Sequence, residues 1–225
     1  MRRYFFTVLA VTAFLMVSGS ASGSILNFDA VTGADVIFNG SGDTFTFRPE
    51  TGGPDFRIST VIGQTDPDTD GLTGNIQGTF TIGSISASGP SQTAPVTGTG
   101  TFSILDEAGI LFSAELQWVD IVTVGTGGTI NLNGVANLSG ISYSGLNSDL
   151  LQFIPAGTGT SVITFQFIPG KSLAQLTADG ATNSTSYSGT AVPTPVPIPS
   201  TLILLGSGLA GVAAFRRRAK GNDSR

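Results

Sequence analysis

The central part of the chain alternates apolar and polar residues with a period of two. Breaks rich in glycine, asparagine and proline separate these runs, and before residue 200 only residues 171–176 hint at a helix. A period of two places alternate side chains on opposite faces of a strand. Many short strands with frequent turns predict an all-β domain, an antiparallel β-sandwich or jelly-roll-like fold. The clearest runs contain Phe45 and Phe47, Phe56 and Ile58, Phe80 and Ile82, Phe102 and Ile104, Ile130 and Leu132, and Phe165 and Phe167.

The single tryptophan lies in one of these predicted strands, residues 114–121. Strict alternation places Trp118 on the same face as Leu116 and Asp120, and Glu115 on the opposite face. Trp118 is then either a stacking platform for a sugar, with Glu115 or Asp120 beside it, or an aromatic residue of the core. The second interpretation is favoured, because a lone tryptophan in a β-domain usually packs inside.

The N-terminal segment has the three parts of a secretory signal peptide. Two arginines follow Met1, an apolar run extends to Val17, and small residues follow it. We therefore predict a signal helix within a signal peptide of residues 1–23, cut by signal peptidase after Ala21 or Gly23. The apolar run is too short for a membrane span, which needs about 20 residues.

The C-terminal segment contains three consecutive features. Alternating prolines in residues 191–199 predict a stiff, extended linker. Residues 200–215 carry no charge and predict a short transmembrane helix, about 24 Å long against a hydrocarbon core of roughly 30 Å. The basic residues of the tail, residues 216–225, predict a cytoplasmic end, so that the main domain faces outward.

This C-terminal segment resembles a PEP-CTERM sorting tail. The resemblance rests on the motif Val196, Pro197, Ile198 and Pro199, on the glycine-broken apolar helix, and on Arg216, Arg217 and Arg218. It implies that exosortase, a membrane-embedded cysteine protease, processes the tail and that the cargo reaches the cell surface or the exopolysaccharide matrix. Ile198 stands where the family has glutamate, so a permanent C-terminal membrane anchor remains the alternative.

Composition limits what the domain between the two ends, residues 24–190, can do. Between Ser24 and Pro199, three basic and fourteen acidic residues leave a net charge of −11. Nucleic-acid binding is excluded, because phosphate affinity needs clustered lysine and arginine. The whole chain has neither cysteine nor histidine. Disulfides, cysteine or histidine nucleophile pairs and histidine-based zinc sites are therefore excluded, and we expect no enzyme activity.

One segment suggests metal chemistry. Asp66, Asp68 and Asp70 alternate along the chain, and Gly71 follows in the sixth position of the segment. Carboxylates in this pattern resemble the first half of an EF-hand calcium loop, but the twelfth position is Gln77 instead of a bidentate glutamate. The segment is either a weak calcium site or an exposed acidic turn. We expect no other cofactor.

These observations lead to three functional hypotheses. The first is an exported, non-catalytic structural or adhesive protein of the cell surface or biofilm matrix, anchored transiently in the inner membrane with its domain on the periplasmic side. The second is a carbohydrate-binding module for exopolysaccharide, with Trp118, Tyr143 or Tyr187 as stacking rings. The third is a glycoside-active enzyme, which needs two carboxyl groups about 5–10 Å apart.

Overall fold

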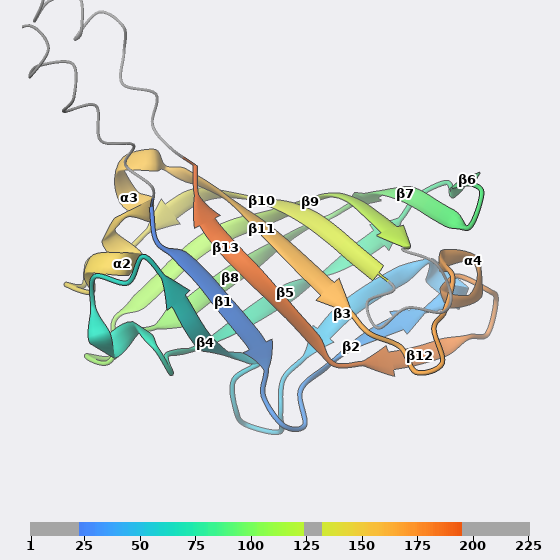
Figure 1. The fold of residues 1–225 in the computed structure, drawn as a ribbon. Helices are drawn as coiled ribbons and strands as arrows, with labels where there is room; N and C mark the ends of the chain where they lie inside the picture. Colours follow the sequence, from blue (N-terminus) through green and yellow to red (C-terminus); the bar gives the residue numbers. More distant parts are fainter. Residues whose placement is uncertain (1–22, 124–131, 195–225) are drawn as a thin grey trace, which may run out of the picture. The chain divides into compact units, whose positions relative to one another are not determined.

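The described part of the chain is built almost entirely from antiparallel strands. The computed structural model describes residues 23–123 and 132–194, which contain thirteen strands and three four-residue helices (Figure 1). All of the strand pairs are antiparallel. The predicted all-β class is confirmed.

The strands in chain order are β1 (Ile25–Ala30), β2 (Asp35–Asn39), β3 (Thr44–Arg48), β4 (Phe56–Ile62), β5 (Thr73–Ile82), β6 (Ser86–Ser88), β7 (Ser91–Thr97), β8 (Thr99–Leu105), β9 (Leu111–Thr123), β10 (Leu132–Ser142), β11 (Thr158–Phe165), β12 (Thr182–Thr185) and β13 (Tyr187–Pro193). The helices are α2 (Ser148–Leu151), α3 (Phe153–Ala156) and α4 (Leu173–Leu176), with 3₁₀ turns η1 (Gly40–Gly42) and η2 (Pro67–Thr69). A capping box between Ser172 and Gln175 starts α4, at the predicted helical hint.

Eight strands close into a hydrogen-bonded ring. The order around it is β1, β4, β5, β8, β9, β10, β11 and β13, and β13 pairs with β1 to complete it. The closing contact between β4 and β5 is short, with Phe56 opposite Gly74 and Arg57 opposite Thr73. Because the ring is closed, each of these eight strands is paired along both edges for at least part of its length. This arrangement leaves fewer free backbone groups that could pair with strands of other chains.

Two long strands extend beyond the ring and change partners. The first part of β5 pairs with β4 and β8, and its last part pairs with β3 and β7. Likewise, β9 pairs first with β8 and then with β7. The remaining strands, β12, β2, β3, β7 and β6, are attached through these extensions. The structure therefore differs from a sandwich of two separate sheets, because β5 and β9 are long enough to belong to both halves.

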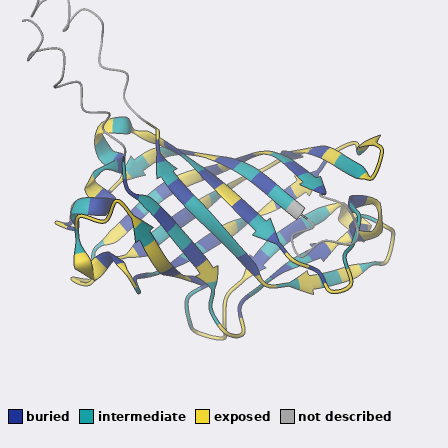
Figure 2. Ribbon diagram, in the orientation of Figure 1, coloured by how far each residue is buried: buried dark blue, intermediate teal, exposed yellow. Residues whose placement is uncertain are grey.

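Aromatic side chains fill the interior, and buried residues alternate with more exposed ones along the strands (Figure 2). One cluster within the ring joins Phe28, Phe56 and Phe102, whose ring centroids lie 4.7–5.7 Å apart. A larger cluster joins Phe38, Phe45, Phe47, Phe80, Trp118, Phe165, Phe167 and Tyr187. The predicted inward residues Phe45, Phe47, Phe56, Ile58, Phe80, Ile82, Phe102, Ile104, Phe165 and Phe167 are all buried. Burial of each large apolar side chain contributes about 1.5–3 kcal/mol, which fits a chain that has no disulfide.

A β-bulge in β9 corrects the predicted face of Asp120. The register against β10 shifts between Val135, opposite Asp120, and Ala136, opposite Trp118, so Val119 is the extra residue. The bulge reverses the alternation: Trp118 and Ile121 are buried, and Asp120 is partly exposed. Strict alternation failed here because an inserted residue moves every later side chain to the opposite face.

The C-terminal boundary of the domain also differs from the prediction. β13 continues to Pro193, and Ala191 pairs with both Leu26 and Ser161. Residues 191–193, assigned to the linker, therefore belong to the last strand. The signal peptide up to residue 22, the transmembrane helix of residues 200–215 and the basic tail lie outside the described residues. Among the described helices, none is long and apolar enough to cross a bilayer.

Candidate functional site

The aspartate-rich turn, residues 66–71, is organised by hydrogen bonds to the Asp66 carboxylate. Asp66 begins η2: its Oδ1 accepts a hydrogen bond from the Asp68 backbone N–H at 3.1 Å, and its Oδ2 accepts one from the Ser148 N–H at 3.2 Å. In the described part of the chain, no group of three or more acidic side chains is arranged to hold a metal ion. Asp66, Asp68 and Asp70 therefore do not converge, because the turn directs Asp66 into backbone capping.

The aspartate-rich turn is fixed to the domain by a buried carboxylate, Asp149. Oδ1 accepts hydrogen bonds from Thr65 N–H at 2.9 Å, Thr65 Oγ1 at 2.7 Å and Ser24 Oγ at 2.6 Å. Oδ2 accepts from Asp66 N–H at 3.1 Å and Thr69 Oγ1 at 2.8 Å. Asp149 is fully buried. Burial by itself raises the pKa of Asp149, but the hydrogen bonds from Ser24, Thr65 and Thr69 outweigh it and hold the pKa below its ordinary value.

The hydrogen-bonded residues around Asp149, here called the cluster, also hold the first residues of the described domain. Ser24 is fully buried, its N–H donates to Gln152 Oε1 at 2.6 Å, and its hydroxyl oxygen, which donates to Asp149, also lies 3.0 Å from the Gly63 carbonyl oxygen. Both predicted signal-peptidase cuts leave Ser24 in the mature chain. The cluster therefore has a structural role, because it connects the start of β1 to α2 and to the aspartate-rich turn through hydrogen bonds.

Trp118 is a core residue, as the favoured interpretation of the sequence predicted, and it is not the sugar-stacking platform of the alternative interpretation. Its side chain is 3 % exposed. Phe47 and Phe165 stack against the indole with centroids 6.3 and 6.1 Å away, and Phe45 meets it edge-on at 5.0 Å. The indole is therefore enclosed by other aromatic side chains of the core and is not open to a ligand.

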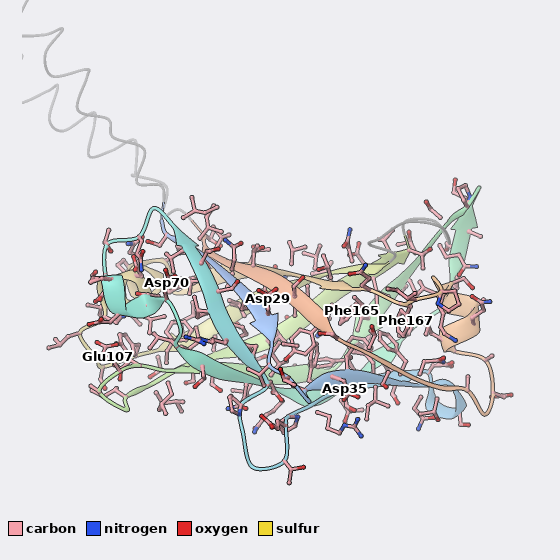
Figure 3. All side chains as sticks on the ribbon, turned by 60° about the horizontal axis from the view of Figure 1, so that its bottom comes forward. Asp29, Asp35, Asp70, Glu107, Phe165 and Phe167 are labelled. Carbon is pink, nitrogen blue, oxygen red and sulfur yellow. The ribbon has the colours of Figure 1, made fainter. Side chains whose placement is uncertain are left out.

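Tyr143 and Tyr187 are buried as well, so neither presents an exposed ring. The Tyr143 hydroxyl donates to Asp106 Oδ2 at 2.7 Å and accepts from the Asn147 N–H at 3.0 Å. Burial, and then the hydrogen bond to Asp106, raises the pKa of Tyr143 to about 12. Burial also raises the pKa of Tyr187. The adjacent Glu107 lies at the end of the domain away from Phe165 and Phe167 (Figure 3).

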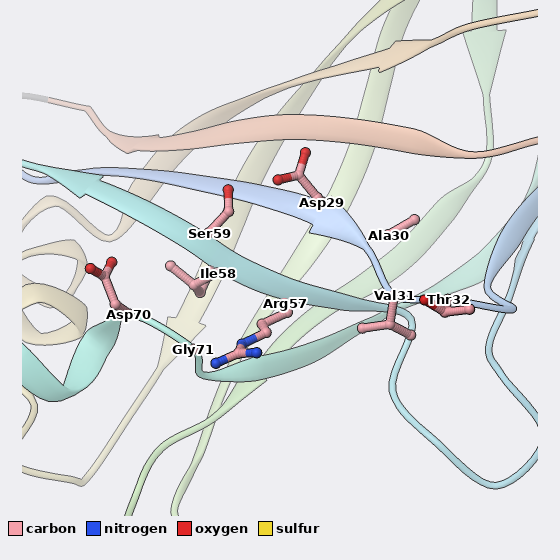
Figure 4. A pocket seen from close by; sticks show the side chains of 9 residues that line it. All are labelled: Asp29, Ala30, Val31, Thr32, Arg57, Ile58, Ser59, Asp70 and Gly71. Atoms are coloured by element: carbon pink, nitrogen blue, oxygen red, sulfur yellow. The ribbon is translucent and has the colours of Figure 1, made fainter.

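A surface pocket of about 530 Å³ lies between β1, β4 and the aspartate-rich turn. Asp29 stands opposite Arg57 in the β1–β4 register, and Arg57 points toward Gly71 (Figure 4). Arg57 makes neither an ion pair nor a side-chain hydrogen bond with any described residue. The nine lining residues are Asp29, Ala30, Val31, Thr32, Arg57, Ile58, Ser59, Asp70 and Gly71.

Sequence reasoning missed this pocket and found only one of its carboxylates, Asp70. The available signal was that Arg57 is one of just three basic residues between Ser24 and Pro199. Its position opposite Asp29 depends on a register shift between β1 and β4, at which Ser59 of β4 is the extra residue. Pairwise alternation alone does not reveal such a shift.

Comparison with known families identifies the C-terminal segment. Residues 195–218 match the PEP-CTERM protein-sorting motif. This range includes Val196, Pro197, Ile198, Pro199 and the three arginines at 216–218, so the resemblance seen in the sequence is confirmed. The chain thus carries a PEP-CTERM protein-sorting motif, which implies export and processing by exosortase. Comparisons with curated proteins and with solved structures gave no match.

Proposed function

We propose that this chain is a structural or adhesive protein of the bacterial cell surface or biofilm matrix, and that it is not catalytic. The observation that carries the proposal is the sorting motif at residues 195–218, directly behind a folded β-domain. Such a motif delivers a cargo to the outside of the cell, and a compact domain on its N-terminal side is the cargo.

The attachment of the tail suits a load-bearing role. The tail follows β13, which lies between β1 and β11 in the ring, and the Thr194 N–H extends this pairing to the Thr158 carbonyl at 3.1 Å. A force on the tail therefore acts on a strand that is paired along both edges. The neighbouring strand β1 starts where β13 ends. The hydrogen bond between Ser24 and Asp149 secures this start of β1. An exported adhesive domain would gain mechanical resistance from this arrangement.

The partners of the proposal follow from the route of delivery. Signal peptidase would remove the leader, the C-terminal helix would hold the chain transiently in the inner membrane with its domain on the periplasmic side, and exosortase would then act near Pro197 and Pro199. Exopolysaccharide is the proposed partner outside the cell. The excess of acidic residues supports solubility and argues against nucleic acid.

The proposal is tested in the producing cells by deleting the chain and restoring two forms of it. The full chain should restore surface adhesion and matrix-bound protein. A chain that ends at Pro199 should be exported but lost into the medium, and should restore neither. Equal adhesion with and without the chain would contradict the structural role, and turnover of matrix polysaccharide by the purified protein would contradict the non-catalytic role.

A further inference from the structure

We propose that the pocket around Arg57, here called the Arg57 pocket, binds uncharged sugar units of a polysaccharide. The inference rests on the proposed surface or matrix role and adds a site and a ligand class to it. It also relocates carbohydrate recognition away from Trp118, Tyr143 and Tyr187, whose rings are buried.

The walls of the Arg57 pocket are fixed by backbone hydrogen bonds. The Gly71 N–H donates to the Ile58 carbonyl at 2.9 Å, and the Ile58 N–H donates to the Leu72 carbonyl at 2.8 Å. On the opposite side, the Val31 N–H donates to the Asp55 carbonyl at 3.1 Å. The pocket is therefore formed before a ligand arrives, which lowers the entropic cost of binding.

The Arg57 guanidinium is available for binding, and the absence of a side chain at Gly71 leaves room for it. Gly71 has a φ of +91°, and a Cβ built there would lie 2.7 Å from Arg57 Nη2. The guanidinium thus lies close against the glycine backbone, where a larger residue would displace it. Because Arg57 has no ion-pair or hydrogen-bond partner among the described residues, all of its donors can serve a ligand.

Other polar side chains line the same pocket. Asp29 lies on the strand beside Arg57, Asp70 lies on the adjoining turn, and Ser59 and Thr32 complete the polar rim (Figure 4). Sugar hydroxyls both donate and accept hydrogen bonds, so carboxylates and a guanidinium can engage neighbouring hydroxyls of one ring. The volume of about 530 Å³ lies within the range of about 300–1,000 Å³ typical of small-ligand pockets.

Charge decides between neutral and acidic sugars. Two carboxylates and one guanidinium give the Arg57 pocket a net negative charge, and residues between Ser24 and Pro199 sum to −11. A polyuronate would approach a surface of its own sign, which opposes association. An uncharged glycan is not repelled in this way, so the negative electrostatic potential of the surface favours neutral over acidic sugars.

The test uses the full chain with its sorting tail, purified in mild detergent, and two sets of probes: oligosaccharides of neutral glucan, mannan and galactan, and oligosaccharides of polyuronate. Wild-type protein should bind at least one neutral series, and polyuronate should bind more weakly or not at all. Arg57→Gln should weaken neutral binding by about tenfold or more. Arg48→Gln should leave it within about twofold, because Arg48 pairs with Asp35 outside the pocket.

Melting temperatures of both variants within about 2 °C of wild type would show that they are folded. If neither variant alters binding, if no neutral series binds, or if polyuronate binds best, the inference is overturned. The Arg57→Gln chain should be delivered to the surface like wild type. Normal delivery without sugar binding would thus refute the site alone, whereas failed delivery of wild type would refute the proposed function.

Discussion

The substitution Asp149→Asn should destabilise the domain while barely changing its shape. An asparagine keeps one acceptor oxygen and replaces the other by an NH₂ donor. In one orientation this NH₂ faces the Asp66 N–H and the Thr69 hydroxyl, and in the other it faces the Thr65 N–H. Either orientation sets a donor against a buried backbone N–H. The negative charge that strengthens these hydrogen bonds is lost as well.

The magnitude follows from these contacts. A buried donor without a partner costs about 1–3 kcal/mol, and hydrogen bonds to a charged group contribute about 1.5–3 kcal/mol each but are not additive. We expect a loss of about 3 kcal/mol in the free energy of unfolding. For a domain of this size, that lowers the melting temperature by roughly 6–12 °C.

The assay is urea unfolding of the full chain, followed by tryptophan fluorescence. The protein has one tryptophan, and Trp118 lies in the core, so its emission reports on the packing of the domain. Asp68→Asn is the matched control, because Asp68 is exposed in the same aspartate-rich turn and its carboxylate makes no hydrogen bond with any residue that the structure describes. The control should stay within about 0.5 kcal/mol of wild type.

At acidic pH, the difference in the free energy of unfolding between wild type and Asp149→Asn should disappear. The pKa of Asp149 is lower in the folded protein than its ordinary value of 3.8. Its stabilising contribution is therefore complete above about pH 5 and is lost as pH falls through the folded-state pKa. An Asp149→Asn protein as stable as wild type at pH 7, or a gap that does not narrow in acid, would refute this account of the cluster.

Three further predictions concern the core, the alkaline limit and calcium. Gly134→Ala should cost about 2–3 kcal/mol in urea unfolding, because a Cβ there overlaps the indole of Trp118. The stability contributed by Tyr143 should be complete below about pH 10 and decline as pH rises toward its folded-state pKa of about 12, a dependence that Tyr143→Phe should lack in alkaline unfolding curves. Calcium at about 1 mM should leave the melting temperature unchanged, because the carboxylates of the aspartate-rich turn do not converge.

Each of these predictions has a control or a contrary result. Gly42→Ala should be nearly neutral, since its nearest neighbour is a Thr44 side-chain atom 3.7 Å away. A Gly134→Ala loss no larger than that of Gly42→Ala would show that the core is looser than described. Identical alkaline curves for wild type and Tyr143→Phe would remove the proposed role of that hydroxyl. A rise in melting temperature with calcium, abolished by Asp68→Ala with Asp70→Ala, would restore the calcium site.

The strands were predictable where each keeps one face inside along its whole length. Phe45, Phe80 and Phe102 follow this rule, and all three are fully buried. The rule failed at Val119, because a bulge inserts a residue that local sequence does not mark. It also failed at Ala191, where proline-rich composition indicated a linker although the backbone pairs with β1 and β11.

The functional residues also divide into those that local sequence reveals and those that are brought together only by the fold. The sorting motif is a local signal, since its prolines, apolar helix and arginines are consecutive in the chain, and it was recognised from the sequence. The Arg57 pocket combines residues from β1, β4 and the aspartate-rich turn, so it exists only after the strands have paired. Asp149 likewise forms a hydrogen bond with Ser24, which is 125 positions away in the sequence. Contacts of this kind depend on topology, which alternation alone does not specify.

The most direct test of the central claim is the intact mass of the protein recovered from the surface and the medium of the cells that make it. The account predicts a chain that begins at Ser22 or Ser24 and ends near Pro199, with added mass at its new C-terminus, because a chain that merely ends at Pro199 should be lost into the medium. Recovery of a chain that still carries Arg216, Arg217 and Arg218 in the membrane fraction would contradict it. That result would mean that Ile198 disables the motif and that the domain is permanently anchored.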